Sequence, residues 1–248
     1  FEGVRELLAD DGVLWLNLGD SYANDAKWGG SSGGKHVQAL HGNTGIGRGK
    51  NDTGLKPKNL VGAPWRVAFA LQEAGWYLRQ DIIWHKPNPM PESVTDRCTK
   101  AHEYVFLLSK SERYFFDAEA IKEPAVTVGD TRHLRRDKTA DARLSPSGRE
   151  GNGKPQAETR NRRSVWTVAT RPYKGAHFAT FPPDLIEPCI LAGAPAGGIV
   201  LDPFFGSGTT GQVSQALGRQ FVGLELNEAY KPLQDERLRQ PSLMLEAA

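Results

Sequence analysis

The chain has 248 residues, of which 39% are hydrophobic and 9% aromatic, enough for one large domain or two small ones with a sizeable core. Its formal net charge is only +2, so a nucleic-acid partner has to be argued from local basic segments. Cys98 and Cys189 are isolated and match no zinc spacing, which argues against a disulfide framework or a metal site and favours a reducing compartment. The sequence has no apolar run of about 18 residues, so we predict no membrane span, and it has no recognisable signal peptide.

The N-terminal part predicts a helix, a strand and a loop. FEGVRELLADDG is amphipathic, with Phe1, Val4, Leu7 and Leu8 on one helical face, and because the chain begins within it at Phe1 we expect further residues upstream. The near-continuous apolar run at 13–19 predicts a buried parallel strand. Residues 23–59 contain nine glycines, six Lys or Arg and two Asp, so we expect a flexible basic loop.

The middle of the chain predicts one helix, two strands and a second polar segment. Pro64 opens a helix that Gly75 ends. Strands are expected at 76–86 and 102–110, with the proline-rich KPNPMPES as a loop between them. RYFFD, residues 113–117, is a candidate to pair beside the second strand. The window 129–163 carries ten Lys or Arg against five Asp or Glu, a local charge of +5.

The remainder alternates between strand and helix patterns. The expected strands are SVWTV, GGIVLDPF and RQFVGLELN, and the expected helices are PDLIEPCILAG, TTGQVSQALG and NEAYKPLQDERLRQ. Such alternation predicts an α/β fold with a doubly wound parallel sheet.

The most informative stretch is LDPFFGSGTTGQVSQALGRQFVGLELN, residues 201–227. A predicted strand ends at Asp202, and Gly206-Ser207-Gly208 then leads into a helix whose N-terminus favours negative charge. Glu225 ends the next strand about 20 residues later, where a carboxylate can accept hydrogen bonds from ribose hydroxyls. The turn lacks the lysine of a Walker A loop and is not GxGxxG, which argues against a dehydrogenase. We predict a nucleoside site, and the alternative is an ordinary strand-to-helix turn with structural glycines.

DPFFGSGTT followed by FVGLELN resembles the S-adenosylmethionine motif of DNA amino-methyltransferases, which modify the exocyclic amino group of cytosine or adenine. GVLWLNLGDSYA, DIIWHKPNPMPES, AHEYVFLLSKS and GAHFATFPPDLIEPCILAG are similar to further blocks of the family, and together the blocks span nearly the whole chain. Their order matches the permuted β class. The resemblance implies a Rossmann-like S-adenosylmethionine-dependent methyltransferase sheet with polar DNA-recognition inserts. The catalytic half is expected at 1–123 with a flexible insert at 23–59, the target-recognition insert at 124–163, and the cofactor-binding half at 164–248.

The resemblance also implies which residues line the cofactor. Those expected at the methionine end are Asp202, Phe204, Gly206, Ser207 and Gly208, with Thr209 and Thr210 beside its carboxylate. Glu225 is expected to hold the ribose, with Leu226 and Asn227 flanking the adenine. Those expected to close over the ligand are Phe178, Thr180 and Phe181, and those expected at the end of their own strand are Gly19, Asp20 and Ser21.

Duplex DNA is the implied substrate, and basic residues are the expected contacts to phosphate or guanine. In the 129–163 window these are Arg132, Arg135, Arg136, Arg160, Arg162 and Arg163, and Lys86 is a further phosphate contact. The alternative for these segments is that they are solvated loops. The resemblance further implies a prokaryotic or phage-encoded cytoplasmic protein, and a homodimer is a further expectation because dimers are common in the class.

The family's catalytic signature, a polar residue followed by Pro-Pro and an aromatic, does not occur in this sequence. Phe181-Pro182-Pro183-Asp184 has the prolines with other neighbours, so we expect the signature upstream of Phe1 and leave the catalytic residues unassigned. We find five core strands where the fold has seven, which agrees with this expectation. LNLGDSYA and WHKPNPMPES resemble members that carry Ser-Pro-Pro-Tyr, which favours the N4 amino group of cytosine. The alternatives are an N6-adenine methyltransferase and a non-catalytic fragment that binds cofactor or DNA.

Overall fold

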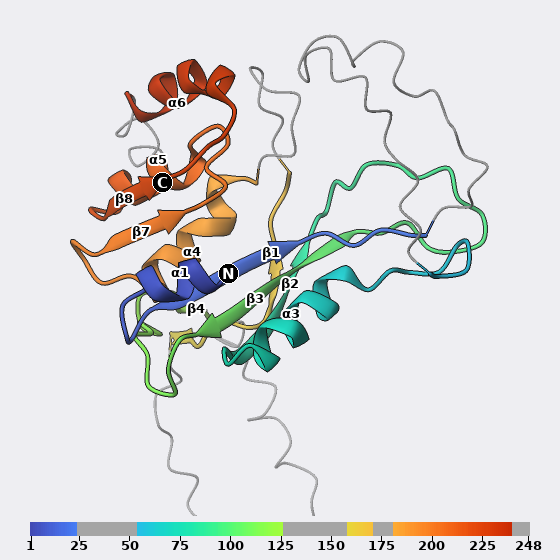
Figure 1. Cartoon of the computed structure of the whole chain (residues 1–248), viewed down its shortest axis with the longest axis horizontal. Coiled ribbons are helices and arrows are strands. Elements are labelled where there is room, and N and C mark those ends of the chain that lie inside the picture. Colours follow the sequence, from blue (N-terminus) through green and yellow to red (C-terminus); the bar gives the residue numbers. More distant parts are fainter. Residues whose placement is uncertain (24–53, 126–157, 171–180, 240–248) are drawn as a thin grey trace, which may run out of the picture. The chain divides into compact units, whose positions relative to one another are not determined.

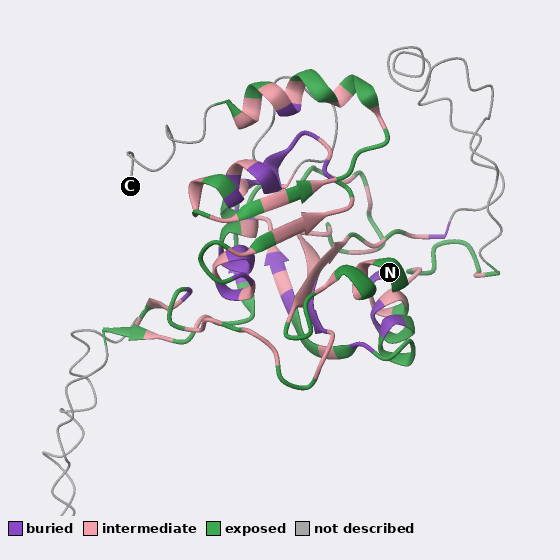
Figure 2. Ribbon diagram, turned by 60° about the vertical axis from the view of Figure 1, so that its left-hand side comes forward, coloured by how far each residue is buried: buried purple, intermediate pink, exposed green. Residues whose placement is uncertain are grey.

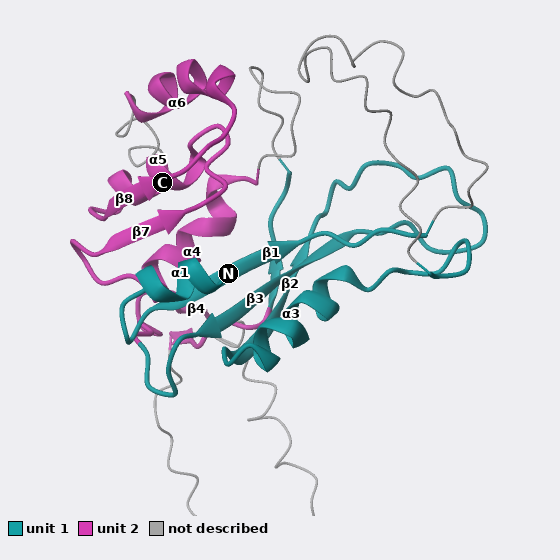
Figure 3. Cartoon of the chain, viewed as in Figure 1, with its two compact units in different colours: residues 1–114, 165–170 teal, residues 115–164, 171–248 magenta. Residues whose placement is uncertain are grey.

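The computed structural model describes residues 1–23, 54–125, 158–170 and 181–239. The chain divides into two compact units, one of residues 1–114 with 165–170 and the other of residues 115–164 with 171–248 (Figures 1 and 3). Residues 115–123 belong to the second of these compact units and residues 165–170 to the first.

Unit 1 contains a four-stranded sheet in the order β1-β3-β2-β6. Its strands are β1 (Val13–Leu18), β2 (Tyr77–His85), β3 (His102–Ser109) and β6 (Val165–Thr167), and its helices are α1 (Glu2–Leu7) and α3 (Ala63–Glu73). The strands and helices predicted for this part of the chain are therefore present, with bounds that differ from the predictions by one or two residues at most sites.

The direction of β3 corrects the expectation of an all-parallel sheet. β3 runs antiparallel to both β1 and β2, with Val13 opposite Ser109 and His85 opposite His102, and only β6 runs parallel to β2. The connection from β2 to β3, residues 86–101, contains no crossover helix, so the chain reverses and returns beside the strand it has just left. The apolar run at 13–19 forms a strand, but its partner β3 is antiparallel rather than parallel.

The core of unit 1 lies between α3 and the sheet. Phe106 and Leu108 of β3 are fully buried and belong to one hydrophobic cluster with Ala68 and Leu71 of α3. Figure 2 colours the ribbon by burial, with buried segments in purple. Val4 of α1 and Leu8, which directly follows the helix, pack against this cluster, whereas Leu7 is 75% exposed, so only part of the predicted apolar face is buried. The central position of β3 follows from its apolar sequence, which buries every residue from 105 to 109.

Unit 2 contains a parallel strand pair with a crossover helix. Its elements are β4 (Glu123–Pro124), β5 (Thr159–Arg160), α4 (Pro183–Gly193), β7 (Ile199–Asp202), α5 (Thr209–Ala216), β8 (Gln220–Gly223), the 3-10 turn η2 (Glu228–Tyr230) and α6 (Lys231–Leu238). β7 and β8 pair in parallel, with Asp202 opposite Gly223. The prediction that RYFFD pairs beside a strand is wrong, because residues 113–117 contain no strand and the Asp117 side chain instead accepts hydrogen bonds from the backbone N–H groups of Glu119 and Ala120.

Two short antiparallel pairings flank the segments 24–53 and 126–157. Before the first segment, Ala23 exchanges backbone hydrogen bonds of 2.8 Å with Lys58 and Asn59. Around the second, β4 pairs with β5, and the N–H of Ala125 donates to the carbonyl of Glu158 at 2.9 Å. The described residues on the two sides of each segment are therefore hydrogen-bonded neighbours. None of the helices in the described ranges is long and apolar enough to cross a membrane.

Candidate functional site: the glycine turn of unit 2

Two carboxylates lie at the same edge of the parallel strand pair. Asp202 is the last residue of β7, and Glu225 follows two residues after the end of β8. Backbone bonds of 2.9 Å from Leu224 to Asp202 and from Phe205 to Leu224 continue the pairing beyond the strands. Open α/β sheets bind ligands at this carboxyl edge, and both acids lie there.

The Asp202 carboxylate ties the strand end to the following helix. One oxygen accepts from the backbone N–H of Phe204 at 2.9 Å, and the other accepts from the hydroxyl of Thr210 at 2.5 Å. Since Thr210 lies in the first turn of α5, this single side chain fixes both ends of the intervening turn.

The Glu225 carboxylate holds the turn from the other strand. Its Oε2 accepts from the N–H of Gly206 and its Oε1 from the N–H of Asn227, each at 2.8 Å. A carboxylate has about four acceptor positions, so each oxygen keeps capacity for a second donor. Glu225 is exposed, so this remaining acceptor capacity is accessible to solvent.

The turn itself depends on two glycines in the left-handed region. Gly206 has φ of 52°, and Gly208, the N-cap of α5, has φ of 85°. Residues with a Cβ rarely adopt these angles. Among the described residues, a Cβ on Gly206 would meet only the Phe204 carbonyl oxygen, at 3.8 Å.

The two adjacent phenylalanines of the turn have opposite environments. Phe205 is 7% exposed and stacks on Phe221 with ring centroids 5.5 Å apart, whereas Phe204 is 78% exposed. A Cβ on Gly211 would lie 2.7 Å from the Phe205 ring, and a Cβ on Gly223 would overlap it. Glycine at 211 and 223 therefore makes room for the ring that seats the turn.

The exposed groups around the turn fit the cofactor that the resemblance implied. Apolar Phe204, Leu224 and Leu226 are 78%, 53% and 102% exposed beside the Glu225 carboxylate. An adenosine group needs apolar surface for its base and acceptors for its ribose hydroxyls, and this edge offers both. The side chain of Asn227 is oriented by the backbone that follows it, since its Oδ1 accepts a hydrogen bond from the N–H of Ala229 at 3.1 Å.

Two residues of α6 that sequence reasoning did not identify also hold the turn. Gln234 is 8% exposed and donates from Nε2 to the Gly206 carbonyl at 2.8 Å. Arg237 donates to the hydroxyl of Thr209. Their spacing of three residues places them on one helical face, but nothing in the sequence says which surface that face meets.

In unit 1, the predicted residues after β1 have structural contacts of their own. The Asp20 carboxylate accepts from the backbone N–H groups of Ser21 and Ala63, at 2.9 and 3.0 Å, and so holds the start of α3. A Cβ on Gly19 would lie 3.6 Å from the Glu103 carboxylate carbon.

Lys86, a predicted phosphate contact, is paired within unit 1. Its ammonium group forms a salt bridge with Glu103 and lies 4.2 Å from the centre of the Trp84 ring. The two charged side chains are 18% and 26% exposed, so this charge is largely compensated within the protein.

Arg160 and Arg163 share one carboxylate in unit 2. Their Nε atoms lie 2.8 and 2.6 Å from Glu123 Oε1. Burial raises the pKa of Glu123, but the guanidinium groups of Arg163 and Arg160 outweigh it and hold that pKa below its usual range. Burial likewise raises the pKa of the Cys189 thiol, which the charge of Arg162 offsets only in part.

Several predicted site residues lie outside the described ranges, namely Arg132, Arg135, Arg136, Phe178 and Thr180. Phe181 is described and half-buried just before α4. Among the described residues, no three His, Cys, Asp or Glu side chains are grouped to hold a metal ion.

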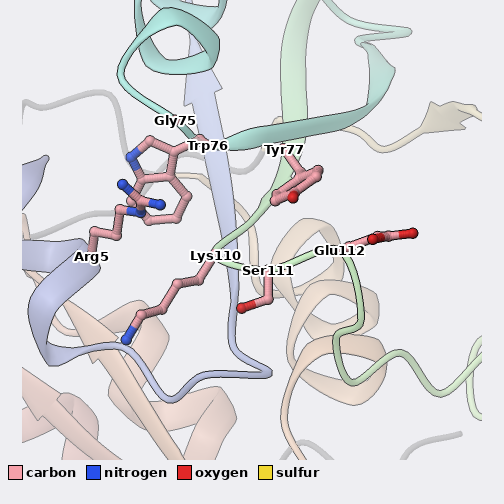
Figure 4. Close-up of a pocket in the computed structure, with 7 residues that line it drawn as sticks. All are labelled: Arg5, Gly75, Trp76, Tyr77, Lys110, Ser111 and Glu112. Carbon is pink, nitrogen blue, oxygen red and sulfur yellow. The ribbon is translucent and has the colours of Figure 1, made fainter.

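A cavity of about 450 Å³ opens at the other end of the unit 1 sheet, where β2 begins and β3 ends (Figure 4). Its two cations are engaged by the protein. Arg5 donates to the carbonyl of Ala74 at 3.3 Å, and Lys110 donates to the carbonyl of Leu8 at 2.8 Å and pairs with Asp10. The cavity lies away from the carboxyl ends of β1 and β2 and carries no pair of strand-end acids.

Comparisons with known proteins show the family of this chain. The family profile N6_N4_Mtase, described as DNA methylase, matches residues 1–236. The type II methyltransferase M.SmaI of Serratia marcescens is 48% identical over 239 residues, which cover 96% of this chain and 71% of that protein. M.XycI of Xanthomonas campestris pv. cyanopsidis is 47% identical over 240 residues, covering 96% and 69%.

Solved structures share the fold. The PvuII DNA methyltransferase, described as cytosine-N4-specific, matches with a TM-score of 0.59 at 17% identity, over 94% of this chain and 66% of that one. A Thermus thermophilus protein described as a DNA modification methylase, in complex with S-adenosyl-L-methionine, matches with a TM-score of 0.56 at 20% identity, over 96% and 73%.

Proposed function

The chain belongs to the N6_N4_Mtase family of DNA methylases, which are S-adenosylmethionine-dependent enzymes, and we propose that it methylates the N4 amino group of cytosine in duplex DNA. The choice of cytosine is supported by the likeness of LNLGDSYA and WHKPNPMPES to members with Ser-Pro-Pro-Tyr. The PvuII enzyme, described as cytosine-N4-specific, has the same fold. Adenine N6 is the competing target.

The observation that carries the proposal is the pair of strand-end acids around a left-handed glycine turn. In the proposal Glu225 accepts the ribose hydroxyls with its remaining acceptor positions, while Leu226 and Asn227 flank the adenine. The residues at the methionine end are Asp202, Phe204, Gly206, Ser207 and Gly208. Thr209 and Thr210, at the positive end of α5, face the methionine carboxylate, and Arg237 adds positive charge beside Thr209.

The cofactor supplies an electrophilic methyl group, and the chain's residues supply orientation and a dry site. The target amino group is paired inside the duplex, so the base has to leave the stack to be reached. Gly19, Asp20 and Ser21, together with Phe178, Thr180 and Phe181, remain proposed cofactor contacts. No residue of this chain is assigned to catalysis.

The proposed DNA contacts differ in their exposure and in their ion pairs within the protein. Arg163 is 64% exposed and so can reach a phosphate while remaining near Glu123, whereas Lys86 is held by Glu103 and would have to leave it. Arg132, Arg135, Arg136, Arg160 and Arg162 complete the proposed set. A homodimer and a cytoplasmic location, where the DNA of a bacterium lies, are further parts of the proposal.

Cofactor binding is tested by calorimetric titration with S-adenosylhomocysteine. The wild-type chain and an Asp11→Ala control, which removes an exposed acid of unit 1, are expected to bind equally. Asp202→Ala is expected to bind at least about tenfold more weakly, because the turn loses its tie to α5. If Asp202→Ala bound S-adenosylhomocysteine as tightly as the wild-type chain, the glycine turn would not be part of the cofactor site.

The target base is tested by incubating the chain with S-adenosylmethionine and duplex DNA, followed by nucleoside analysis by mass spectrometry. N4-methylcytosine is the expected product. N6-methyladenine as the product would instead mean that adenine is the target base. Clear cofactor binding without a methylated base would make the chain a non-catalytic binder.

A further inference from the structure

We propose that Gln234, in α6, is a positioning residue that fixes the cofactor-binding turn through the carbonyl of Gly206. The inference rests on the proposed function, because it concerns the same turn. It goes beyond that function by assigning a role to a helix that contributes no expected cofactor contact.

Both peptide groups of Gly206 are held by side chains from the single stretch 225–238. Its N–H donates to Glu225 Oε2 at 2.8 Å, and its carbonyl accepts from Gln234 Nε2 at 2.8 Å. A glycine has no side chain of its own to anchor, and at φ of 52° it can reach several other conformations. These two hydrogen bonds therefore determine the direction in which its peptide groups point.

The burial of Gln234 is unusual for its helix. α6 has the polar sequence KPLQDERL, and Gln234 is its buried residue, whereas Leu233 and Leu238 are only half-buried. Buried positions normally favour apolar side chains, and a buried amide costs free energy unless it is hydrogen-bonded. A glutamine at this position therefore indicates that the hydrogen bond itself matters.

The helix backbone lies directly against the turn. A Cβ on Gly208 would lie 3.5 Å from the Cα of Gln234, and Arg237, one turn further, bonds Thr209 at the start of α5. Gln234 and Arg237 thus both hold the turn from α6. A turn held in place before the ligand arrives loses less conformational entropy on binding, so affinity is expected to depend on this clamp.

Two substitutions separate the hydrogen bond from simple space filling. Gln234→Met keeps the length and volume of the side chain but cannot donate. Gln234→Glu keeps the shape and can donate to the carbonyl only when its carboxyl group is protonated. The affinity of Gln234→Glu for S-adenosylhomocysteine is therefore expected to rise as the pH falls.

The other charged groups around the turn are Asp202 and Glu225 at the strand ends and Arg237 on α6 itself. Lys231 and Asp235 of the same helix pair with each other. Any pH dependence that arises from these five charged groups is present in the wild-type and Gln234→Met profiles as well. Only the difference between Gln234→Glu and these two profiles reports on the new carboxyl group.

The experiment is calorimetric titration with S-adenosylhomocysteine between about pH 5 and pH 8, a range that brackets a raised carboxyl pKa. The variants are Gln234→Met, Gln234→Glu and Gln215→Glu, the last being the same change at an exposed position of α5. We expect Gln234→Met to bind about tenfold more weakly throughout, and Gln234→Glu to be weaker still at pH 8 and to approach wild type at pH 5. Gln215→Glu should follow wild type.

Three results would overturn the inference. Wild-type affinity in Gln234→Met would mean that the donor is dispensable. A Gln234→Glu profile parallel to that of Gln234→Met would mean that a hydrogen-bond donor at this position does not restore affinity, and thermal unfolding of both variants at each pH shows that the chains compared are folded. Absence of binding by the wild-type chain would instead remove the proposed function, and the inference with it.

Discussion

At the residue scale, the carboxylate of Glu225 combines two tasks, since it holds the turn and keeps acceptor capacity toward solvent. Replacing it with an amide puts an NH₂ group against one of the two backbone N–H donors. We expect Glu225→Gln to weaken S-adenosylhomocysteine binding about 10- to 100-fold in a calorimetric titration, the usual range for a lost hydrogen bond to a charged group. Glu228→Gln, three residues further along, is the matched control, and an equal loss there would contradict the assignment.

Adjacent phenylalanines provide a second residue-scale prediction. Phe205 is buried and Phe204 exposed, so Phe205→Ala is expected to lower the free energy of unfolding by about 3–5 kcal/mol. Phe204→Ala should change it by no more than about 0.5 kcal/mol, yet reduce cofactor affinity. Urea unfolding followed by ligand titration measures both quantities. A stability loss of similar size in the two variants would refute the described seating of the turn.

Most of the candidate site's residue types could be predicted from sequence, because a strand-end acid, two close glycines and a second acid one strand later are all local patterns. The part that could not be predicted depends on packing between distant segments. Which of two identical neighbouring phenylalanines enters the core depends on the glycines at 211 and 223. Gln234 could not be identified, because its partner is a backbone carbonyl 28 residues away.

At the element scale, the β4–β5 pair is expected to carry a measurable pH dependence. The pKa of Glu123 is held below its usual range in the folded chain by Arg163 and Arg160. The stabilisation is therefore fully present above the ordinary carboxyl pKa of about 4.3 and is lost as the pH falls through the lower folded value. Glu123→Gln should thus be less stable than wild type at neutral pH, and the two should converge in acid.

Thermal unfolding of wild type and Glu123→Gln across this pH range checks the expectation. Glu187→Gln, on the exposed face of α4, is the control and should parallel wild type. A constant difference between Glu123→Gln and wild type down to the lowest pH would mean that the ion pairs contribute no stability.

The positions of helices and strands were predicted more reliably than the directions of the strands. The apolar runs and the glycine and proline positions located β1, β2, β3 and α3 closely. Strand direction was not predicted, because β1 and β3 are both apolar runs and a buried antiparallel strand has the same pattern as a parallel one. The polar loop of 86–101 was the available signal, since a parallel return needs a crossover connection that this loop does not provide.

At the scale of the whole molecule, the proposal predicts where a bound ligand changes backbone dynamics. Hydrogen exchange with saturating S-adenosylhomocysteine should slow at residues 202–210 and 225–238 of unit 2, because binding stabilises the segments that form the site. Asp202→Ala under the same conditions is the control and should lack the effect. Slowing confined to the cavity around Arg5 and Lys110 would place the ligand elsewhere.

The short pairings at Ala23 with Lys58 and Asn59, and of β4 with β5, have an evolutionary consequence. Each pairing holds the two ends of an intervening segment next to each other through backbone hydrogen bonds. Doubling the length of a loop whose ends are already adjacent costs only about 0.6 kcal/mol. Insertions and deletions between these paired positions therefore cost little stability, and evolution can vary the length of the chain there while the turn at 202–210 stays unchanged.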